Sequence, residues 1–314
     1  MGNCELSSVQ SNDVALAILT CNAARYWEAF REGVQKQSVR PKQVLVIDSA
    51  STDGTLQLAA CSGFEAHSIS RASFDHGRTR QLAVDILWNV PVIVFLTQDA
   101  VLANQDSLRS LVAAFEDSSV GAAYGRQVPR PSATPIEAHA RLFNYPAHSI
   151  VRNLDSRRTL GFKSIFLSNS FAAYRRDALL SVGGFPSSAI FGEDTIVTAK
   201  LHLAGWKTAY VAEAEVVHSH SYSAVEEMRR YFDIGVLHTH EAWLVREFGG
   251  TGGEGGRFVL SEMQFLRLNG PQHIPSALWR TFAKFLGYHL GKRERFLPLH
   301  IKRLFSMSKT YWTR

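Results

Sequence analysis

The sequence predicts an α/β protein built on a mostly parallel sheet, and three observations carry that prediction. Apolar runs of strand length alternate with amphipathic helical segments over the first hundred residues, with short links between them. The run at 92–96 is continuously apolar, which suits a strand covered on both faces. Polar residues follow three of the runs directly, at Asn22, Asp48 and Asp99. Because parallel strands end at one edge of a sheet, these side chains should meet there, where open α/β sheets bind ligands.

The expected elements follow the chain in order, each strand an apolar run and each helix a segment with one apolar face. We expect strands at 14–19, 43–47, 65–69 and 92–96, and helices at 26–35, 56–60 and 81–88. The second half changes character. We expect a loop at 126–135, one or two strands with a polar break in 164–174, and a turn at 183–186. A helix from 191 through 203 follows, then extended segments at 208–212 and 215–221, and a helix after Met228.

Composition narrows the class of protein. The 314 residues are 46% hydrophobic, enough for a large core, and no apolar run is long enough to span a bilayer. The polar N-terminus lacks a charged-then-apolar signal, and Cys4, Cys21 and Cys61 have no metal or redox spacing, which indicates a reducing cytoplasm. The glycine-rich motifs for dinucleotides and for phosphate loops are missing, which excludes a dehydrogenase half and a P-loop enzyme.

The positive charge is concentrated at the C-terminus. Residues 257–314 carry eleven Lys or Arg against two Glu, a charge of +9, which leaves −3 on the other 256 residues. Apolar residues recur at helical spacing in this tail, at Leu278, Phe282, Phe285, Leu286 and His289, and again at Leu297, Ile301, Leu304 and Phe305. Two basic amphipathic helices, over about 275–314, either rest on an anionic membrane surface or pack on the rest of the protein. No recognised module supports nucleic-acid binding.

The domain organisation follows from these shifts in composition. We expect one domain at 1–248, in two halves at about 13–125 and about 126–248. Six glycines at 249–256 predict a flexible linker, and 257–314 forms the basic helical tail.

Two acidic positions are candidates for chemistry. Asp99, flanked by Gln98 and a small alanine, can hold a divalent cation against a diphosphate, or it can cap a helix. Glu193 and Asp194 stand together at a helix start, where they either act in catalysis or complement the helix dipole.

The remaining candidate site residues have imidazole or guanidinium side chains. His218 and His220 share one face of an extended segment, so either can reach a metal, whereas His238 and His240 point apart on a helix. Arg78 or Arg80 either neutralises a diphosphate or is a solvated helix start.

The motifs together resemble a known family. Thr20-Cys21-Asn22, the stretch VIDSASTDGT at 46–55, Gln98-Asp99-Ala100 and Gly192-Glu193-Asp194 are similar to a family 2 glycosyltransferase with the Rossmann-like GT-A fold, over about residues 13–241. Three further stretches look like the bacterial rhamnosyltransferase branch, whose donor is usually dTDP-L-rhamnose. They are FDHG at 74–77, VHSH at 217–220 and RYFDIG at 230–235.

The resemblance implies that 1–248 is a catalytic domain, with a nucleotide-binding half at about 13–125 and an acceptor-binding half at about 126–248. It also implies a role for each matching residue. The positions that hold the base and ribose of the nucleotide are Thr20, Asn22, Asp48 and Ser51. His76, Gly77 and Arg80 match the diphosphate side, and Gln98 belongs to the nucleotide-binding set. Asp99 matches the last acid of an Asp-x-Asp motif that ligates Mg²⁺ or Mn²⁺, with His218 or His220 nearby, and Asp194 matches the general base. Thr97 replaces the first acid, which implies weak metal affinity or an ion that arrives with the nucleotide.

The expected function is therefore an inverting glycosyltransferase. It moves L-rhamnose from dTDP-L-rhamnose to a hydroxyl of a growing cell-surface polysaccharide or lipid-linked saccharide, in the cytoplasm, and on the inner face of the bacterial plasma membrane if the tail binds lipid. Residues 168–171 and Trp206 either hold the reactants in line or are plain loop and core residues. The alternatives are a UDP-hexose donor, a nucleotidyltransferase, or a non-catalytic sugar-nucleotide-binding protein.

Overall fold

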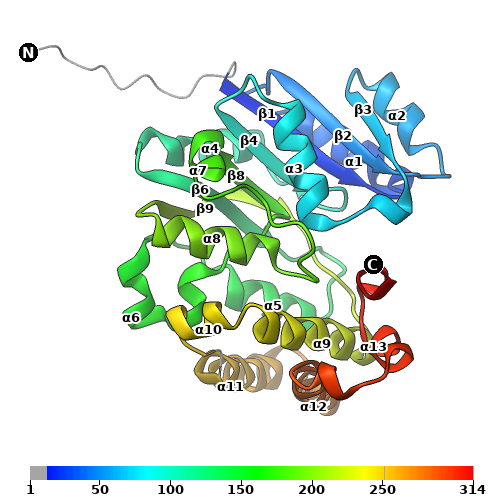
Figure 1. Cartoon of the computed structure of the whole chain (residues 1–314), viewed down its shortest axis with the longest axis vertical. Helices are drawn as coiled ribbons and strands as arrows, with labels where there is room; N and C mark the ends of the chain where they lie inside the picture. Colours follow the sequence, from blue (N-terminus) through cyan, green and yellow to red (C-terminus); the bar gives the residue numbers. More distant parts are fainter. Residues whose placement is uncertain (1–12, 251, 314) are drawn as a thin grey trace, which may run out of the picture.

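The computed structural model describes residues 13–250 and 252–313, so Cys4 and the polar N-terminus lie outside the described residues. One mixed sheet of nine strands organises these residues, with helices against both faces (Figure 1). Its strands occur in the order β3-β2-β1-β4-β8-β6-β9-β5, and β7 pairs with β9. They are β1 (Val14–Thr20), β2 (Gln43–Ser49), β3 (Glu65–Ile69), β4 (Val92–Thr97), β5 (Val101–Leu102), β6 (Val120–Val128), β7 (Ile150–Arg152), β8 (Phe171–Arg175) and β9 (Lys207–Val217).

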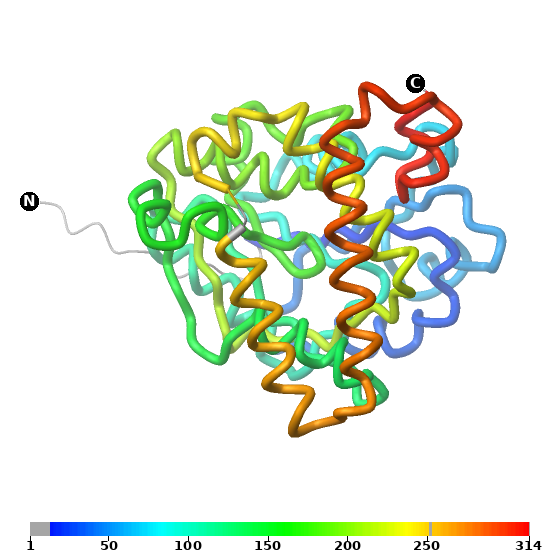
Figure 2. The backbone as a smooth tube through the Cα atoms, turned by 90° about the horizontal axis from the view of Figure 1, so that it is seen from below, coloured from blue at the N-terminus to red at the C-terminus, as the bar shows by residue number. Residues whose placement is uncertain are grey.

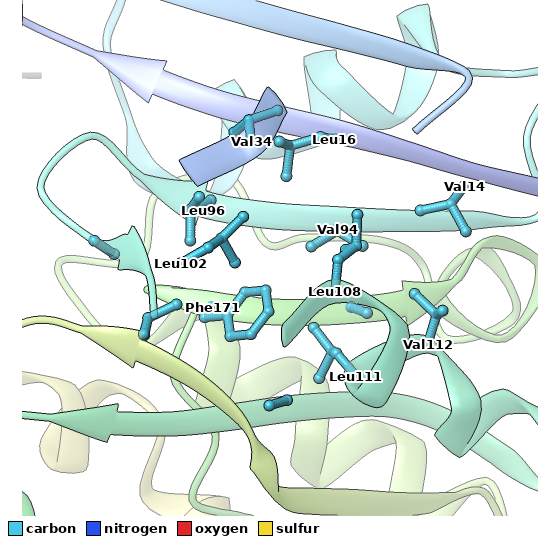
Figure 3. Close-up of a cluster of buried hydrophobic side chains, with 14 of the residues drawn as sticks. Val14, Leu16, Val34, Val94, Leu96, Leu102, Leu108, Leu111, Val112 and Phe171 are labelled. Carbon is cyan, nitrogen blue, oxygen red and sulfur yellow. The ribbon is translucent and has the colours of Figure 1, made fainter. Parts of the chain in front are cut away.

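The first half of the sheet is parallel, as the apolar runs predict. β1 pairs in parallel with β2 and β4, and β3 pairs in parallel with β2 on the outside. One face of these strands packs on α1 and on α4, which follows β5. Val14 and Leu16 of β1, Val94 of β4 and Leu111 of α4 meet there in a closed apolar layer (Figure 3). The polar residues that end β1, β2 and β4 therefore lie at one sheet edge.

The second half adds antiparallel pairings. β8 joins β4 antiparallel, with Leu96 opposite Phe171, and β6 lies antiparallel to β8 and parallel to β9. The polar break predicted in 164–174 is the turn before β8. The two extended segments predicted at 208–212 and 215–221 are one strand, β9, and the coil that continues it.

Eight helices of the described chain accompany the strands. They are α1 (Ala24–Gln35), α2 (Thr55–Cys61), α3 (His76–Ile86), α4 (Ser107–Ala113), α5 (Pro135–Asn144), α6 (Arg157–Leu160), α7 (Arg176–Ser181) and α8 (Glu193–Leu203). α3 begins five residues before the predicted start at Gln81, because the Asp75 side chain caps it by accepting a hydrogen bond of 2.9 Å from the Arg78 backbone N–H.

The C-terminal region is helical, as predicted. It consists of α9 (Ala224–His240), α10 (Ala242–Phe248), α11 (Gly252–Asn269), α12 (Ile274–Gly291) and α13 (Leu299–Phe305). α11 and α12 lie side by side on the lower side of the molecule (Figure 2). The predicted linker at 249–256 is wrong from Gly252 onward. Glu254 forms ion pairs with Lys163 and Arg257, and these pairs favour helix in a glycine-rich segment.

α12 packs against α9 through small residues. A Cβ atom at Gly287 would lie 2.1 Å from the Met228 carbonyl oxygen, and one at Gly291 would lie 2.1 Å from that of Phe232, so only glycine permits this approach. The opposite face of α12, with Leu278, Phe282, Phe285 and Leu286, is exposed. This apolar stripe therefore does not pack on the catalytic domain. None of the helices in the described ranges has both the length and the hydropathy needed to cross a membrane.

Candidate active site

The ends of β1 and β2 are joined by short polar contacts around Asp48. This buried carboxylate accepts hydrogen bonds from the Thr20 hydroxyl at 2.8 Å and from the Ser51 backbone N–H at 2.8 Å. Asn22 has a left-handed φ of 52°, and its side-chain oxygen accepts from the Thr52 N–H at 2.9 Å. The structure thus brings Thr20, Asn22, Asp48 and Ser51 together, while their contact with a nucleotide stays a prediction.

Gln98 joins the ends of β1 and β4. Its side-chain oxygen accepts from the Cys21 N–H at 2.7 Å, and its amide donates to the Cys21 carbonyl at 3.2 Å. Both polar ends of Gln98 therefore contact the Cys21 backbone, which positions the neighbouring Asp99. A direct contact of Gln98 with a nucleotide stays a prediction.

Three side chains converge beyond β4 and β9. The Asp99 carboxylate lies 3.3 Å from His218 Nε2 and 3.7 Å from His220 Nδ1, and one ligand atom from each residue falls within 4.8 Å of the others. His218 continues the line of β9, with its N–H bonded to the Val128 carbonyl at 3.0 Å. Both histidines approach Asp99, so the sheet edge holds two imidazoles and one carboxylate.

The protonation of His218 fits a bound cation. Its Nδ1 lies 2.8 Å from the Gln127 side-chain oxygen, which also accepts from Arg141 at 2.7 Å, so Nδ1 is the donor. Burial lowers the pKa of His218 and lowers that of His220 to about 3, so both rings are neutral. His218 Nε2 then presents a lone pair to the Asp99 carboxylate and is buried with no hydrogen-bond partner. Two facing electron-pair donors suit a metal ion between them.

Arg130 is a cation beside this cluster that sequence reasoning missed. It donates to the Asp99 carbonyl oxygen at 3.0 Å and lies 3.9 Å from the carboxylate. Gln127 and Arg141, which orient His218, were also missed. The only signal in the sequence was the density of arginine and proline at 126–135, which was interpreted as a loop.

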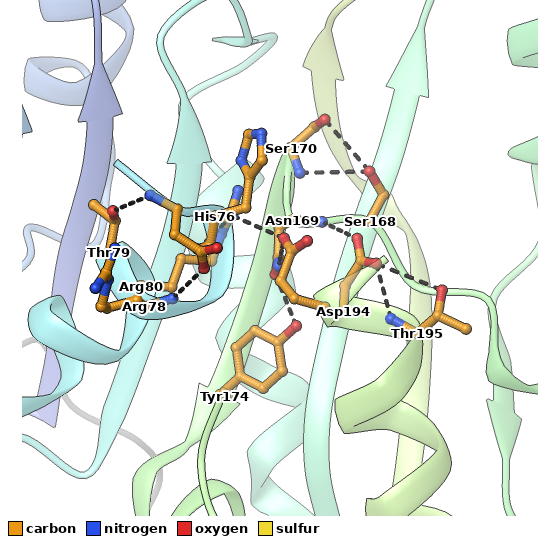
Figure 4. Close-up of polar contacts among 12 residues, drawn as sticks. His76, Arg78, Thr79, Arg80, Ser168, Asn169, Ser170, Tyr174, Asp194 and Thr195 are labelled. Carbon is orange, nitrogen blue, oxygen red and sulfur yellow. Dashed lines mark hydrogen bonds and ion pairs between the residues drawn. The ribbon is translucent and has the colours of Figure 1, made fainter. Parts of the chain in front are cut away.

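Asp194 lies in the first turn of α8, after Gly192, whose φ is 74°. Its carboxylate accepts from the Thr195 N–H at 2.8 Å and from the Asn169 N–H at 3.3 Å (Figure 4). The surrounding protein raises the pKa of Asp194 to about 7, and the negative charge of Glu193 adds to the effect of burial. A partly exposed carboxyl with this pKa can accept a proton near neutral pH.

Glu193 forms a buried ion pair with Arg80, at 2.7 Å. Asn169 completes this pair by donating to Glu193 at 3.0 Å and accepting from the Tyr174 hydroxyl at 2.7 Å. The ion pair neutralises the charge of Arg80 inside the protein, and a contact of Arg80 with a diphosphate stays a prediction. It also separates the two adjacent acids, since Glu193 is paired and Asp194 is not.

The turn at 168–170 connects the two parts of the site. The Gln127 amide that orients His218 also donates to the Ser168 hydroxyl at 3.0 Å, and the next residue, Asn169, bonds Asp194. On the other side, the Thr97 N–H donates to the Ser170 carbonyl at 3.2 Å. Two hydrogen bonds join His218 to Gln127 and Gln127 to Ser168, and the adjacent Asn169 bonds Asp194, so the cluster of Asp99, His218 and His220 is linked to Asp194 through this turn.

The remaining candidates occupy different surroundings. His76 is exposed at the first turn of α3. A Cβ atom at Gly77 would lie 1.8 Å from the Pro186 carbonyl oxygen, so glycine is required here by packing against the 183–186 turn. A contact of His76 or Gly77 with the diphosphate stays a prediction. Trp206 packs beside Gly121 at the core and does not hold a reactant. His238 is buried against Tyr288 and takes no part in the site.

Sequence comparison finds relatives over nearly the whole chain. The family model described as glycosyl transferase family 2 matches residues 16–183. The chain is 48% identical to the O-antigen chain rhamnosyltransferase RfbN of Salmonella typhimurium strain LT2, over 95% of this chain and 96% of that protein. It is 46% identical to the O-antigen chain rhamnosyltransferase WbaN of Salmonella anatum, over 95% of each.

Structure comparison finds the same fold in more distant proteins. The mannosyltransferase PcManGT from Pyrobaculum calidifontis, solved in complex with GDP-Man and Mn²⁺, superimposes with a TM-score of 0.55 and 20% identity, over 96% of this chain and 85% of that one. Residues 1–349 of S. aureus TarS, in complex with UDP-GlcNAc, give a TM-score of 0.54 and 16% identity, over 90% and 91%.

Proposed function

The chain belongs to glycosyl transferase family 2 and has the GT-A fold, and we propose that it transfers L-rhamnose from dTDP-L-rhamnose to a hydroxyl of a growing cell-surface polysaccharide. Two O-antigen chain rhamnosyltransferases at 46% and 48% identity support this sugar. The observation that carries the proposal is the series of hydrogen bonds joining a three-ligand cluster to a carboxyl with a pKa of about 7. Sugar transfer needs both parts, whereas binding alone needs no base.

Asp194 is the residue that we assign to proton transfer. The acceptor hydroxyl must lose its proton as it attacks the anomeric carbon, and the free oxygen lone pairs of Asp194 can receive it. The backbone N–H groups of Asn169 and Thr195 fix the orientation of the carboxylate. Direct attack by the acceptor inverts the anomeric carbon, so a β-linked donor gives an α-linked rhamnoside.

Asp99, His218 and His220 would hold a divalent cation. The carboxylate suits Mg²⁺ or Mn²⁺, and the two imidazoles would complete the ligand set. Bound there, the ion supplies positive charge next to the leaving diphosphate. The polar residues at the ends of β1 and β2 are proposed to receive the base and ribose, with Asp48 holding the Thr20 and Ser51 side chains in place.

A panel of sugar nucleotides with Mn²⁺ tests the donor. We expect release of dTDP and transfer of sugar from dTDP-L-rhamnose, with little turnover of UDP-hexoses. Faster turnover of a UDP-hexose would replace rhamnose by that sugar, and nucleotide binding without diphosphate release would contradict the catalytic proposal.

We also propose that the acceptor is a lipid-linked saccharide, reached at an anionic membrane surface. The exposed stripe of α12 includes Trp279, which is 61% exposed, and Phe285, which is 63% exposed. Within 257–313 the only acids are Glu262 and Glu294, and both are buried, so the charge that this region exposes is positive. Exposed aromatic rings among cations are typical of a surface that enters the headgroup region of an anionic bilayer.

Vesicle sedimentation tests the membrane surface. The full chain should pellet with vesicles containing an anionic lipid and much less with neutral ones. The triple variant W279S/F282S/F285S should stay in the supernatant, while W88S, which changes an exposed Trp on the nucleotide-binding half, should pellet as the wild type does. Equal pelleting of the triple variant and the wild type would contradict the proposal. A wild-type dimer that the triple variant converts to a monomer would also contradict it, because a second copy of the chain would then cover the stripe.

A further inference from the structure

The segment 230–235 has a packing role at most of its positions. Phe232 is fully buried, and Asp233 accepts hydrogen bonds from the Ser306 hydroxyl at 2.6 Å and the Met307 N–H at 3.0 Å, which fixes the end of the chain against α9. A Cβ atom at Gly235 would lie 2.3 Å from the Tyr288 carbonyl oxygen, so this glycine admits α12. Arg230 is different, because it anchors neither α12 nor the tail.

Arg230 is held by aromatic rings. Its guanidinium carbon lies 4.6 Å from the centre of the Phe191 ring and 5.9 Å from that of Tyr222. Within residues 13–250 and 252–313, no carboxylate lies within ion-pair distance of it. Arg80 and Arg126 have carboxylate partners, and the buried Arg152 donates to the backbone carbonyls of Lys163 and Phe166. A partly buried guanidinium with no carboxylate partner among the described residues is suited to an anionic ligand.

The two rings place Arg230 between the two parts of the site. Phe191 precedes Asp194 by three residues at the start of α8. Tyr222 stacks on the His220 ring, with 4.9 Å between centres and 22° between planes. Arg230 therefore lies between the start of α8, which carries Asp194, and the cluster of Asp99, His218 and His220.

We propose that Arg230 binds the phosphate oxygens of the donor's diphosphate, a role that the sequence motifs assigned to Arg80. The inference rests on the proposed function, because it requires a nucleoside diphosphate sugar as donor. The guanidinium presents parallel N–H groups that match two phosphate oxygens, and the flanking rings hold it without consuming those groups. A lipid-linked acceptor also contains a diphosphate, so a prenyl diphosphate is the alternative ligand for Arg230. The contact with Tyr222, which stacks on His220, favours the nucleotide.

Calorimetry with R230Q and three probes tests the assignment. R230Q should bind dTDP about 10- to 100-fold more weakly than the wild type, since one charged hydrogen-bonding group is lost. Thymidine should bind both proteins equally, because the base and ribose lie at the ends of β1 and β2. Farnesyl diphosphate should show no difference. A loss confined to farnesyl diphosphate would overturn the donor assignment in favour of the acceptor.

Two further variants separate charge from structure. R230K keeps a positive charge without the planar fork and should recover only part of the dTDP affinity. R267Q, which removes an exposed arginine of α11, should bind dTDP as the wild type does. A weakening of thymidine and dTDP by the same factor in R230Q would show a merely structural role. Equal dTDP affinity of wild type and R230Q overturns the role of Arg230 alone, whereas a wild type that binds no dTDP overturns the proposed function as well.

Discussion

Replacing Asp194 by Asn tests the general-base assignment most directly. The carboxamide keeps the shape of the side chain, and its oxygen can still accept from the Thr195 N–H, which lies 2.8 Å from the carboxylate. The variant cannot accept a proton from the acceptor hydroxyl. A general base contributes about 10²- to 10⁴-fold to a rate, or about 3–5 kcal/mol of activation free energy, and we expect the variant to lose that much.

The pH profile gives a second measure of the same residue. Because burial and the charge of Glu193 raise the pKa of Asp194 to about 7, the base form is a minor species in acid. In the wild type kcat/KM should rise about tenfold per pH unit below 7 and level off above it. The residual activity of D194N should lack this step.

The free energy of unfolding of the wild type should fall as the pH rises, whereas its activity should rise. A carboxyl whose pKa is 3.8 unfolded and about 7 folded favours the native state below pH 3.8, and this contribution is lost as the pH rises through 7. D194N has no carboxyl to deprotonate, so its stability does not fall in this way. At pH 8 its free energy of unfolding in urea should be at least that of the wild type.

The assay combines initial rates with calorimetry of donor binding. Donor affinity should be nearly unchanged in D194N, and D155N, which changes an exposed acid, should match the wild type in every measurement. The reasoning is refuted if D194N keeps more than about a tenth of the wild-type rate, or if its loss of activity follows a loss of donor affinity.

Three other variants address the supports of the site. E193Q leaves the Arg80 charge buried and unpaired, so urea unfolding should show a loss of about 3–5 kcal/mol, and a stability within 1 kcal/mol of the wild type would contradict the ion pair. D99A should lose Mn²⁺-dependent dTDP binding in calorimetry, and full wild-type activity in excess chelator would argue against a metal at this position. G291V forces α12 away from α9 and should lower stability by about 1–3 kcal/mol, measured by thermal unfolding, whereas G250A has open space and should change little.

Much of the nucleotide-binding half was predictable because its signals are local. A strand covered on both faces must be apolar throughout, and the run at 92–96 shows this without reference to the rest of the chain. The polar residues that end three such runs are placed together by the parallel topology itself. Asp48 and Asp99 were therefore identified from residue type and position, and the C-terminal helices from apolar spacing alone. The expected role of Asp194 came from the family resemblance.

The pairing of charges was not local and depended on the tertiary structure. Arg80 and Glu193 are separated by 113 residues, and their contact exists only because α3 and α8 meet beside the sheet. His218 obtains its tautomer from Gln127, 91 positions earlier, and the exposed stripe of α12 is decided by which face α9 covers. The sequence by itself determined which segments are buried and which residues can do chemistry, since burial imposes a periodic pattern on neighbouring residues. Only contacts between distant segments decided which cation is neutralised, which cation is left free for a ligand, and which apolar face meets solvent. A single contact between distant residues produces no periodic pattern in the sequence.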